Sequence, residues 1–305
     1  MKRVVIWGYH LHTDTYSYVL NGFKKAFEHL GYEVHWFSDE DYPEDFDYDN
    51  CIFMSEGYRD KNIPLRKTST YIVHVCINPQ KYLGNVKKLI DLRYLMERMD
   101  NDNYDFVLDR SNCEELDKGV LWDKNSSEYG ITYVSWATDL LPHEILDEWV
   151  NIERENHYYF VGSTSSSGKF ANTPLIQEFV NCCSENNIGF TYVNPWQTPI
   201  SDEQNRILTQ KSILSPDFRN ITHKNWGYLA CRLFKSISYG HLGMTNSPIN
   251  AKFIDDSIIC EEEIPKLFEE GMKHKNDKDI ILHQMNVVRN NHTYLNRVLG
   301  LEKLF

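Results

Sequence analysis

The first 37 residues constrain the fold most strongly. Val4-Val5-Ile6-Trp7 is an uninterrupted apolar run that ends at Gly8, which is typical of a strand buried on both faces. Gly31 closes the segment that follows, and 33–37 is predicted to be the next strand. Between them, apolar residues recur at the three- and four-residue spacing of a helix: Tyr16, Val19, Leu20, Phe23, Ala26, Phe27 and Leu30. A strand, a helix and a strand in this order predict a βαβ unit with parallel strands.

Further apolar runs continue this pattern through the first half. They predict strands at 51–54, 71–77, 106–108 and 131–136. A helix is predicted over 81–99, because Val86, Leu89, Ile90 and Leu95 fall on one side of a helical wheel.

The second half starts the same pattern again, with Tyr158-Tyr159-Phe160-Val161 followed by Gly162. It predicts helices over 174–187, 227–239, 262–274 and 277–299, and strands at 190–193, 213–215 and 242–245, after a helix and connector over 142–156. We therefore expect an α/β protein of two Rossmann-like domains, 1–150 and 151–305, which face each other across a cleft. The last helix can pack back on the first domain. Ligands of such sheets bind at the carboxyl ends of the strands.

Composition excludes several classes of protein. The chain has 305 residues, 41% of them hydrophobic, and a formal net charge of -12. This disfavours general binding to nucleic acid or to anionic membranes. No apolar run approaches the ~20 residues of a membrane span. The seven cysteines include no C-x-x-C pair, and we expect reduced thiols and no metal site. With no apparent signal peptide, a cytoplasmic location is expected.

Polar residues follow several predicted strands of the first half. His10, His12 and Asp14 lie after the first strand, where one of them could act as a general base, although Asp14 could equally cap the next helix. An acceptor pocket is expected from residues after later strands: Glu56, Gly57, Asn78 and Asp139. Turn and cap chemistry is the alternative explanation for these four.

The loop after the strand at 158–161 could contact phosphate. Small residues from Gly162 and Ser163 onward let backbone N–H groups approach an anion, and Lys169 would add charge. The P-loop pattern fails, because five residues separate Gly162 from Gly168 and Phe170 follows Lys169, so nucleotide hydrolysis is not expected. A surface loop without a ligand is the alternative.

The segment 215–248 reverses the charge of the chain locally. Asp217 is its single acid, against Arg219, His223, Lys224, Arg232 and Lys235. Such a cluster suits a diphosphate, with Ser215, Thr245, Asn246 and Ser247 as further polar contacts. A helix whose cations are merely solvated is the alternative.

Two stretches carry a family resemblance. Cys231-Arg232-Leu233-Phe234-Lys235 through Gly240 and on to Asn246 resembles the "R-x-F-E-x-x-x-x-G" helix and following strand of GT-B-type nucleotide-sugar glycosyltransferases. Asn291-His292-Thr293-Tyr294-Leu295-Asn296-Arg297 resembles the "H-T-Y-x-x-R" close of the same domain. The resemblance covers about 90 C-terminal residues and implies a glycosyltransferase. In it, the second domain holds the donor, Arg232 contacts the diphosphate, and the first domain supplies base and acceptor site.

One departure from the family affects the mechanism. Lys235 stands where many retaining members carry Glu, and Gly227 where they carry a second Glu. We therefore expect an inverting transferase. It would use a UDP- or GDP-sugar as co-substrate, a glycan or glycoconjugate as acceptor, and no further cofactor. No D-x-D follows a predicted strand, so no divalent metal is expected.

Other functions remain open on the sequence alone. A nucleotide-sugar epimerase or hydrolase of the same fold would need no acceptor. A non-catalytic sugar-nucleotide-binding protein would not need His10, His12 or Asp14. A nicotinamide dehydrogenase is disfavoured, because the first loop lacks G-x-G-x-x-G.

Overall fold

The computed structural model divides the chain into two compact units. It describes residues 2–10, 15–95, 98–101, 104–107, 112–124, 128–166, 171–195 and 197–305. Unit 1 comprises Met1–Leu95, Leu108–Leu141 and Thr293–Phe305, and unit 2 comprises Met96–Val107 and Pro142–His292. The chain passes between the units at 141–142, and the last 13 residues belong to unit 1.

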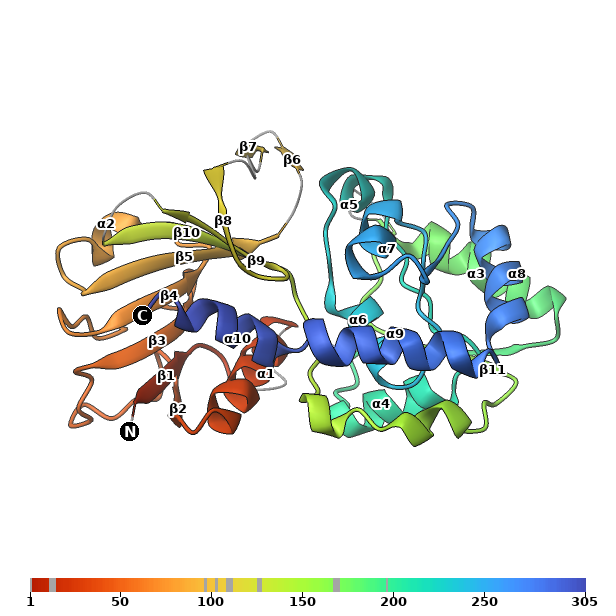
Figure 1. The fold of residues 1–305 in the computed structure, drawn as a ribbon, viewed down its shortest axis with the longest axis horizontal. Coiled ribbons are helices and arrows are strands. Elements are labelled where there is room, and N and C mark those ends of the chain that lie inside the picture. Colours follow the sequence, from red (N-terminus) through yellow and green to blue (C-terminus); the bar gives the residue numbers. More distant parts are fainter. Residues whose placement is uncertain are drawn as a thin grey trace. The chain divides into compact units, whose positions relative to one another are not determined.

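Unit 1 is built on one eight-stranded sheet (Figure 1). Its strands are β1 (Arg3–Trp7), β2 (Glu33–Phe37), β3 (Cys51–Glu56), β4 (Thr70–His74), β5 (Lys88–Tyr94), β8 (Glu114–Asp117), β9 (Val120–Lys124) and β10 (Tyr129–Val134). The order is β2-β1-β3-β4-β5-β10-β9-β8. The six strands from β2 to β10 run parallel, whereas β9 and β8 add an antiparallel edge. The parallel part bears out the α/β prediction, and the antiparallel edge is an addition to it.

Helix α1 (Thr15–His29) connects β1 to β2 and confirms the predicted βαβ unit. Its apolar side is buried as expected, with Phe23, Ala26 and Phe27 fully inaccessible. Helix α10 (Tyr294–Glu302) packs against it, with the rings of Phe23 and Tyr294 4.9 Å apart. A Cβ on Gly22 would collide with the Tyr294 ring, so the close approach of the two helices requires glycine there.

The helix predicted over 81–99 is wrong. The structure has the short α2 (Pro79–Tyr82), followed by the central strand β5. Leu89, Ile90 and Leu92 are all fully buried, because β5 is covered on both faces. A continuous apolar run of this kind fits a buried strand as well as a helix, and the periodicity alone does not separate the two.

Unit 2 contains short parallel strands. They are β11 (His157–Val161), β12 (Gly189–Val193), β13 (Met244–Thr245) and β14 (Ile259–Cys260). The segment 213–217 lies between β11 and β13, because Ile213 N donates to His157 O and Asp217 N to Met244 O. With β12 beside β11 and β14 beside β13, the carboxyl ends of these segments gather at one edge.

Helices cover both faces of these strands. They are α3 (Thr173–Glu185), α4 (Asp202–Lys211), α5 (Ile221–Trp226), α6 (Cys231–Ser238), α7 (Pro248–Ile254), α8 (Ile264–His274) and α9 (Lys278–Asn291). Helices α3 and α8 pack together on one face, where Phe179 and Phe268 meet. On the other, α6 packs against α9 (Figure 1). The 3₁₀ helices η2 (Pro142–Glu144) and η3 (Asp147–Asn151) and the antiparallel pair β6 (Arg98–Asn101) and β7 (Tyr104–Val107) complete the unit.

Two other helix predictions need correction. The helix expected over 277–299 is interrupted at His292, because Thr293 caps α10 in a reciprocal pair of hydrogen bonds with Asn296. The helix expected over 227–239 begins only at Cys231. Gly227, with φ of 65°, instead ends α5, which the sequence analysis did not predict.

Two buried histidines make the fold sensitive to acid. Burial lowers the pKa of both His74 and His241 to about 3, well below the ~6.5 of an exposed histidine. Between these values the unfolded chain binds protons that the folded chain does not. The free energy of unfolding therefore falls as pH falls from ~6.5, by up to ~1.4 kcal/mol per pH unit for each histidine.

We predict that His241→Gln reduces by one the number of protons that the chain takes up on unfolding in this pH range. The side-chain amide keeps a donor for Thr209 O, which lies 2.6 Å from His241 Nε2. Chemical denaturation at pH values between ~5 and ~6.5 measures the slope of unfolding free energy against pH. The slope should be smaller in the variant by about one proton, and an unchanged slope would contradict the assignment.

Candidate functional site

The carboxyl edge of the unit 2 strands brings together most of the residues predicted to bind a donor. Gly162 follows β11, Arg219 follows the segment 213–217, and Asn246 follows β13. Parallel pairing places these loops at the same edge. The side chain of Arg232, from α6, reaches the end of β11.

Arg232 lies directly on the glycine turn that ends β11. Its Nη2 donates to Val161 O at 2.7 Å, and its guanidinium carbon lies 4.4 Å from the centre of the Phe160 ring. Gly162 has φ of 152°, a conformation that residues with a side chain rarely adopt. A Cβ there would collide with the guanidinium. The turn therefore favours glycine after the strand, and a side chain there would shift the Arg232 guanidinium.

The charge of Arg232 is not neutralised within the described part of the chain. Burial lowers the pKa of Arg232, with a smaller opposing effect from Tyr158 and Asp217. No carboxylate among the described residues forms an ion pair with it. Arg154, also without a carboxylate there, donates to the carbonyl oxygens of Gln210, Trp149 and Gly240.

Arg154 and Arg232 differ in the number of hydrogen-bond acceptors around the guanidinium. Arg154 is satisfied by main-chain acceptors, whereas Arg232 has a single carbonyl among the described residues. A half-buried guanidinium with unused donors favours an anion with oxygens spaced for a bidentate contact. This is the chemistry of a carboxylate or a phosphate.

Arg219, by contrast, is already paired. Its Nε donates to Asp217 Oδ2 at 2.7 Å and its Nη2 donates to Oδ1. Burial alone lowers the pKa of Arg219, but the Asp217 carboxylate outweighs burial and raises it. Thr245 Oγ1 donates to the same carboxylate at 3.3 Å, and Asn246 exchanges two hydrogen bonds with the main chain of Arg219. These residues join the strand ends in a buried network.

The other donor-side residues differ in exposure and in partners. Ser215 Oγ lies 2.8 Å from Ser236 Oγ, while Ser163 is exposed. Ser247 Oγ is buried and has no hydrogen bond within the described residues. His223 lies on α5, where burial, reinforced by Arg219, lowers its pKa to about 4, so its ring is neutral at physiological pH. Lys235 is half-buried on α6, and Lys169 lies outside the described residues.

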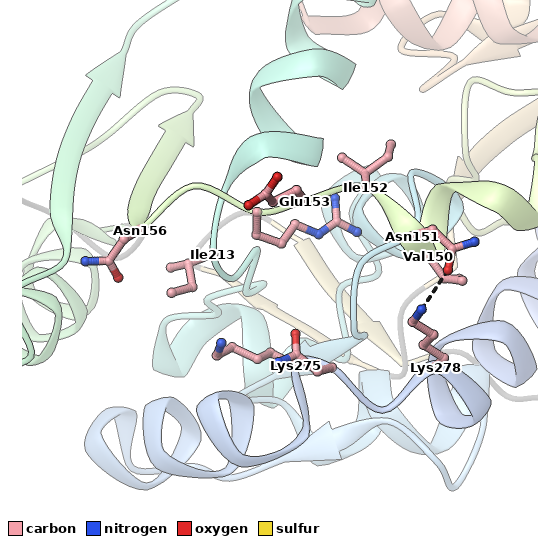
Figure 2. Close-up of a pocket in the computed structure, with 10 residues that line it drawn as sticks. Val150, Asn151, Ile152, Glu153, Asn156, Ile213, Lys275 and Lys278 are labelled. Carbon is pink, nitrogen blue, oxygen red and sulfur yellow. Dashed lines mark hydrogen bonds between the residues drawn. The ribbon is translucent and has the colours of Figure 1, made fainter.

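A cavity of about 540 Å³ lies near the opposite edge of unit 2 (Figure 2). It is lined by Val150, Asn151, Ile152, Glu153, Arg154, Asn156, Ile213, Lys275, Asn276 and Lys278. Asn156 and Ile213 lie at the starts of their strand segments, whereas Gly162 lies at an end. Lys278 Nζ donates to Asn151 Oδ1 at 2.7 Å. The cavity is therefore distinct from the Arg232 site.

The residues predicted to bind an acceptor lie along the carboxyl edge of the unit 1 sheet. Glu56 ends β3, and Gly57 N donates to His74 O at 3.0 Å. Asn78 is exposed before α2, whereas Asp139 is buried after β10 and its carbonyl accepts from Lys25.

Of the candidate bases, His10 is exposed, its ring 6.4 Å from that of Trp36. His12 and Asp14 lie outside the described residues.

His74 also lies at this edge, as the last residue of β4, and it is not among the site residues predicted from the sequence. His74 falls inside the predicted strand 71–77, which was predicted from its apolar residues. The signal that could have identified it is a lone titratable residue in an otherwise apolar strand that ends at the ligand-binding edge of a parallel sheet.

Two general properties of the described residues bear on the site. Within the described ranges, no three His, Cys, Asp or Glu side chains cluster in a way that could hold a metal ion. In the same part of the chain, no helix has both the length and the apolar character needed to cross a membrane.

Comparisons with known proteins give little further guidance. No protein-family model matches the chain, and no curated protein sequence matches it. Among solved structures, the spinosyn rhamnosyltransferase SpnG complexed with thymidine diphosphate aligns over 99% of this chain and 100% of its own. The identity is 9% and the TM-score is 0.36, which is too low to carry an argument about fold or activity.

We predict that Asp217→Asn destabilises unit 2 strongly, because it leaves the Arg219 guanidinium buried without its counterion. Breaking a buried pair in this way costs about 3–5 kcal/mol. Asp147→Asn is the matched control, since it removes an exposed partner of Arg289, and such pairs contribute at most ~1 kcal/mol. Denaturant titration of both variants tests this, and equal losses would show that the buried network does not stabilise the strand ends.

Proposed function

We propose that this protein is a GT-B-type glycosyltransferase. It would transfer a sugar from a nucleoside-diphosphate sugar to a hydroxyl of a glycan or glycoconjugate. The observation that carries the proposal is the half-buried Arg232 guanidinium beside Gly162, at the carboxyl edge of a parallel sheet, with no ion-pair partner among the described residues. The resemblance of 231–246 and 291–298 to the glycosyltransferase motifs supports it independently.

The diphosphate would be held by a bidentate contact from Arg232. The Gly162 turn leaves room for an anion near the main chain, since a side chain there would displace the guanidinium. Lys169 and Lys235 would add positive charge, as would N–H groups of the loop after β11. Together these groups stabilise the charge that develops on the departing nucleoside diphosphate.

In the proposed reaction, the acceptor oxygen attacks the anomeric carbon of the donor sugar. The bond from that carbon to the diphosphate oxygen breaks as the new glycosidic bond forms, with inversion at the anomeric carbon. The proton of the acceptor hydroxyl passes to a general base among His10, His12 and Asp14. We propose that cationic side chains, rather than a metal ion, neutralise the leaving group.

We predict that Arg232→Ala weakens binding of nucleoside diphosphates by about 1.5–3 kcal/mol, the range for a hydrogen bond to a charged group. Isothermal titration calorimetry with UDP, GDP and dTDP measures this. Arg232→Lys should lose less nucleotide affinity than Arg232→Ala, because lysine keeps the positive charge but not the planar, bidentate guanidinium.

Arg206→Ala is a matched control for the arginine variants. Arg206 also lies over an aromatic ring, that of Trp149 at 5.0 Å, but it pairs with Glu203. Its removal should leave nucleotide affinity unchanged. If all three nucleotides fail to bind the unmodified protein, or if Arg232→Ala binds them normally, the proposed function is refuted.

The loop after β1 provides a separate test of catalysis. We predict that alanine at one of His10, His12 or Asp14 lowers sugar transfer by ~10²-fold or more and leaves nucleotide binding intact, because a base acts on the acceptor alone. Transfer and release of radiolabelled sugar are measured with and without acceptors. Release without acceptor would indicate a hydrolase or epimerase, and full activity of all three variants would exclude a base in this loop.

A further inference from the structure

The imidazole of His74 is buried without a hydrogen-bond partner. The residue is 7% exposed, and neither ring nitrogen makes a hydrogen bond to any described residue. Leaving a buried polar group unsatisfied costs about 1–3 kcal/mol, and such groups are rare in folded proteins. The requirements of the core do not explain this histidine, because an apolar side chain of similar shape would avoid the cost.

Aromatic rings from three different elements surround His74. Tyr16, in the first turn of α1, stacks on the imidazole with ring centres 4.3 Å apart. Tyr94 at the end of β5 and Trp136 after β10 lie at 4.8 and 5.5 Å. A small number of polar atoms among aromatic faces is a common lining of small-molecule binding sites.

The main chain beside His74 is strained. Val75 has φ of 53°, a left-handed conformation that a β-branched residue rarely adopts and that costs about 1–3 kcal/mol. Val75 N donates to Leu92 O and Cys76 N to Asp91 Oδ1, which hold the turn in place. Asp91 is itself fixed by Arg93 at 2.7 Å. Strain that is maintained by surrounding bonds in this way is typical of functional sites.

We propose that His74 binds and orients a hydroxyl group of a sugar acceptor. The inference rests on the proposed glycosyltransferase function. A neutral imidazole has one donor and one acceptor nitrogen, so it can accept a hydrogen bond from one hydroxyl and donate to another. Both ring nitrogens are buried in this structure, so the proposal requires one of the surrounding rings to move aside.

The electrostatics assign His74 a positioning role. Burial lowers the pKa of its ring to about 3, so it is neutral at physiological pH and too weak a base to take the proton of a hydroxyl. The general base therefore remains among the candidates in the loop after β1. His74 acts on the acceptor through binding.

His74→Phe tests the proposal by separating stability from binding. It keeps an aromatic ring in the cluster and removes both unsatisfied nitrogens. We expect the free energy of unfolding to be unchanged or higher, and binding of UDP and dTDP to be unchanged. Binding of acceptor probes should weaken at least ~10-fold. The probes are the methyl glycosides of glucose, galactose, mannose and rhamnose, followed by ligand-observed NMR.

A second measurement on the unmodified protein keeps the test independent of how the variant folds. With ¹⁵N-labelled histidine, the His74 ring nitrogens should shift when a binding glycoside is added. His74→Gln, which keeps a donor and an acceptor, should retain part of the affinity. The proposal is overturned if no glycoside binds, if the His74 signals do not move, or if His74→Phe binds glycosides as before. If the unmodified protein binds no nucleotide, the result instead refutes the proposed function.

Discussion

The ion pair between Asp217 and Arg219 holds the carboxyl edge of the unit 2 strands together. Two strand segments, 213–217 and β13, end beside each other with their polar residues buried. The Asp217 carboxylate accepts hydrogen bonds from the Arg219 guanidinium and the Thr245 hydroxyl, and Asn246 fixes the Arg219 main chain. A buried charge is tolerated only when it is paired and hydrogen-bonded. This network pairs one arginine of the cationic segment, Arg219, whereas another, Arg232, forms no ion pair with a described carboxylate.

By the same physical rule, an incompletely hydrogen-bonded side chain stands out in each unit. In unit 2, Arg232 is half-buried and has one carbonyl as acceptor among the described residues. In unit 1, His74 is buried and its nitrogens have no partner there. Neighbouring charged groups are satisfied, as Asp91 is by Arg93 and Cys76. In the described part of the chain, Arg232 differs from Arg154 because it has neither a counterion nor a set of carbonyl acceptors, and the proposed function rests on this difference.

The long-range pattern of the sequence predicts the α/β class, and local periodicity predicts some elements better than others. The βαβ unit over 3–37 is confirmed, because its helix is amphipathic and its strands are apolar throughout. The helix over 81–99 fails, because β5 is buried on both faces and carries no distinguishing alternation. The break at His292 depends on one capping interaction at Thr293, which apolar periodicity does not register.

The sequence by itself determined which chemical groups are present at the strand ends: glycine after β11, a cationic segment over 215–248, and polar residues after β1, β3 and β4. Only the tertiary structure decided which of these groups are already paired. Arg219 and Arg232 are the same residue type in the same cationic segment. Arg219 pairs with a buried carboxylate, whereas Arg232 contacts a glycine turn and an aromatic face. Pairing depends on contacts between residues far apart in the chain, so spacing along the sequence does not predict it.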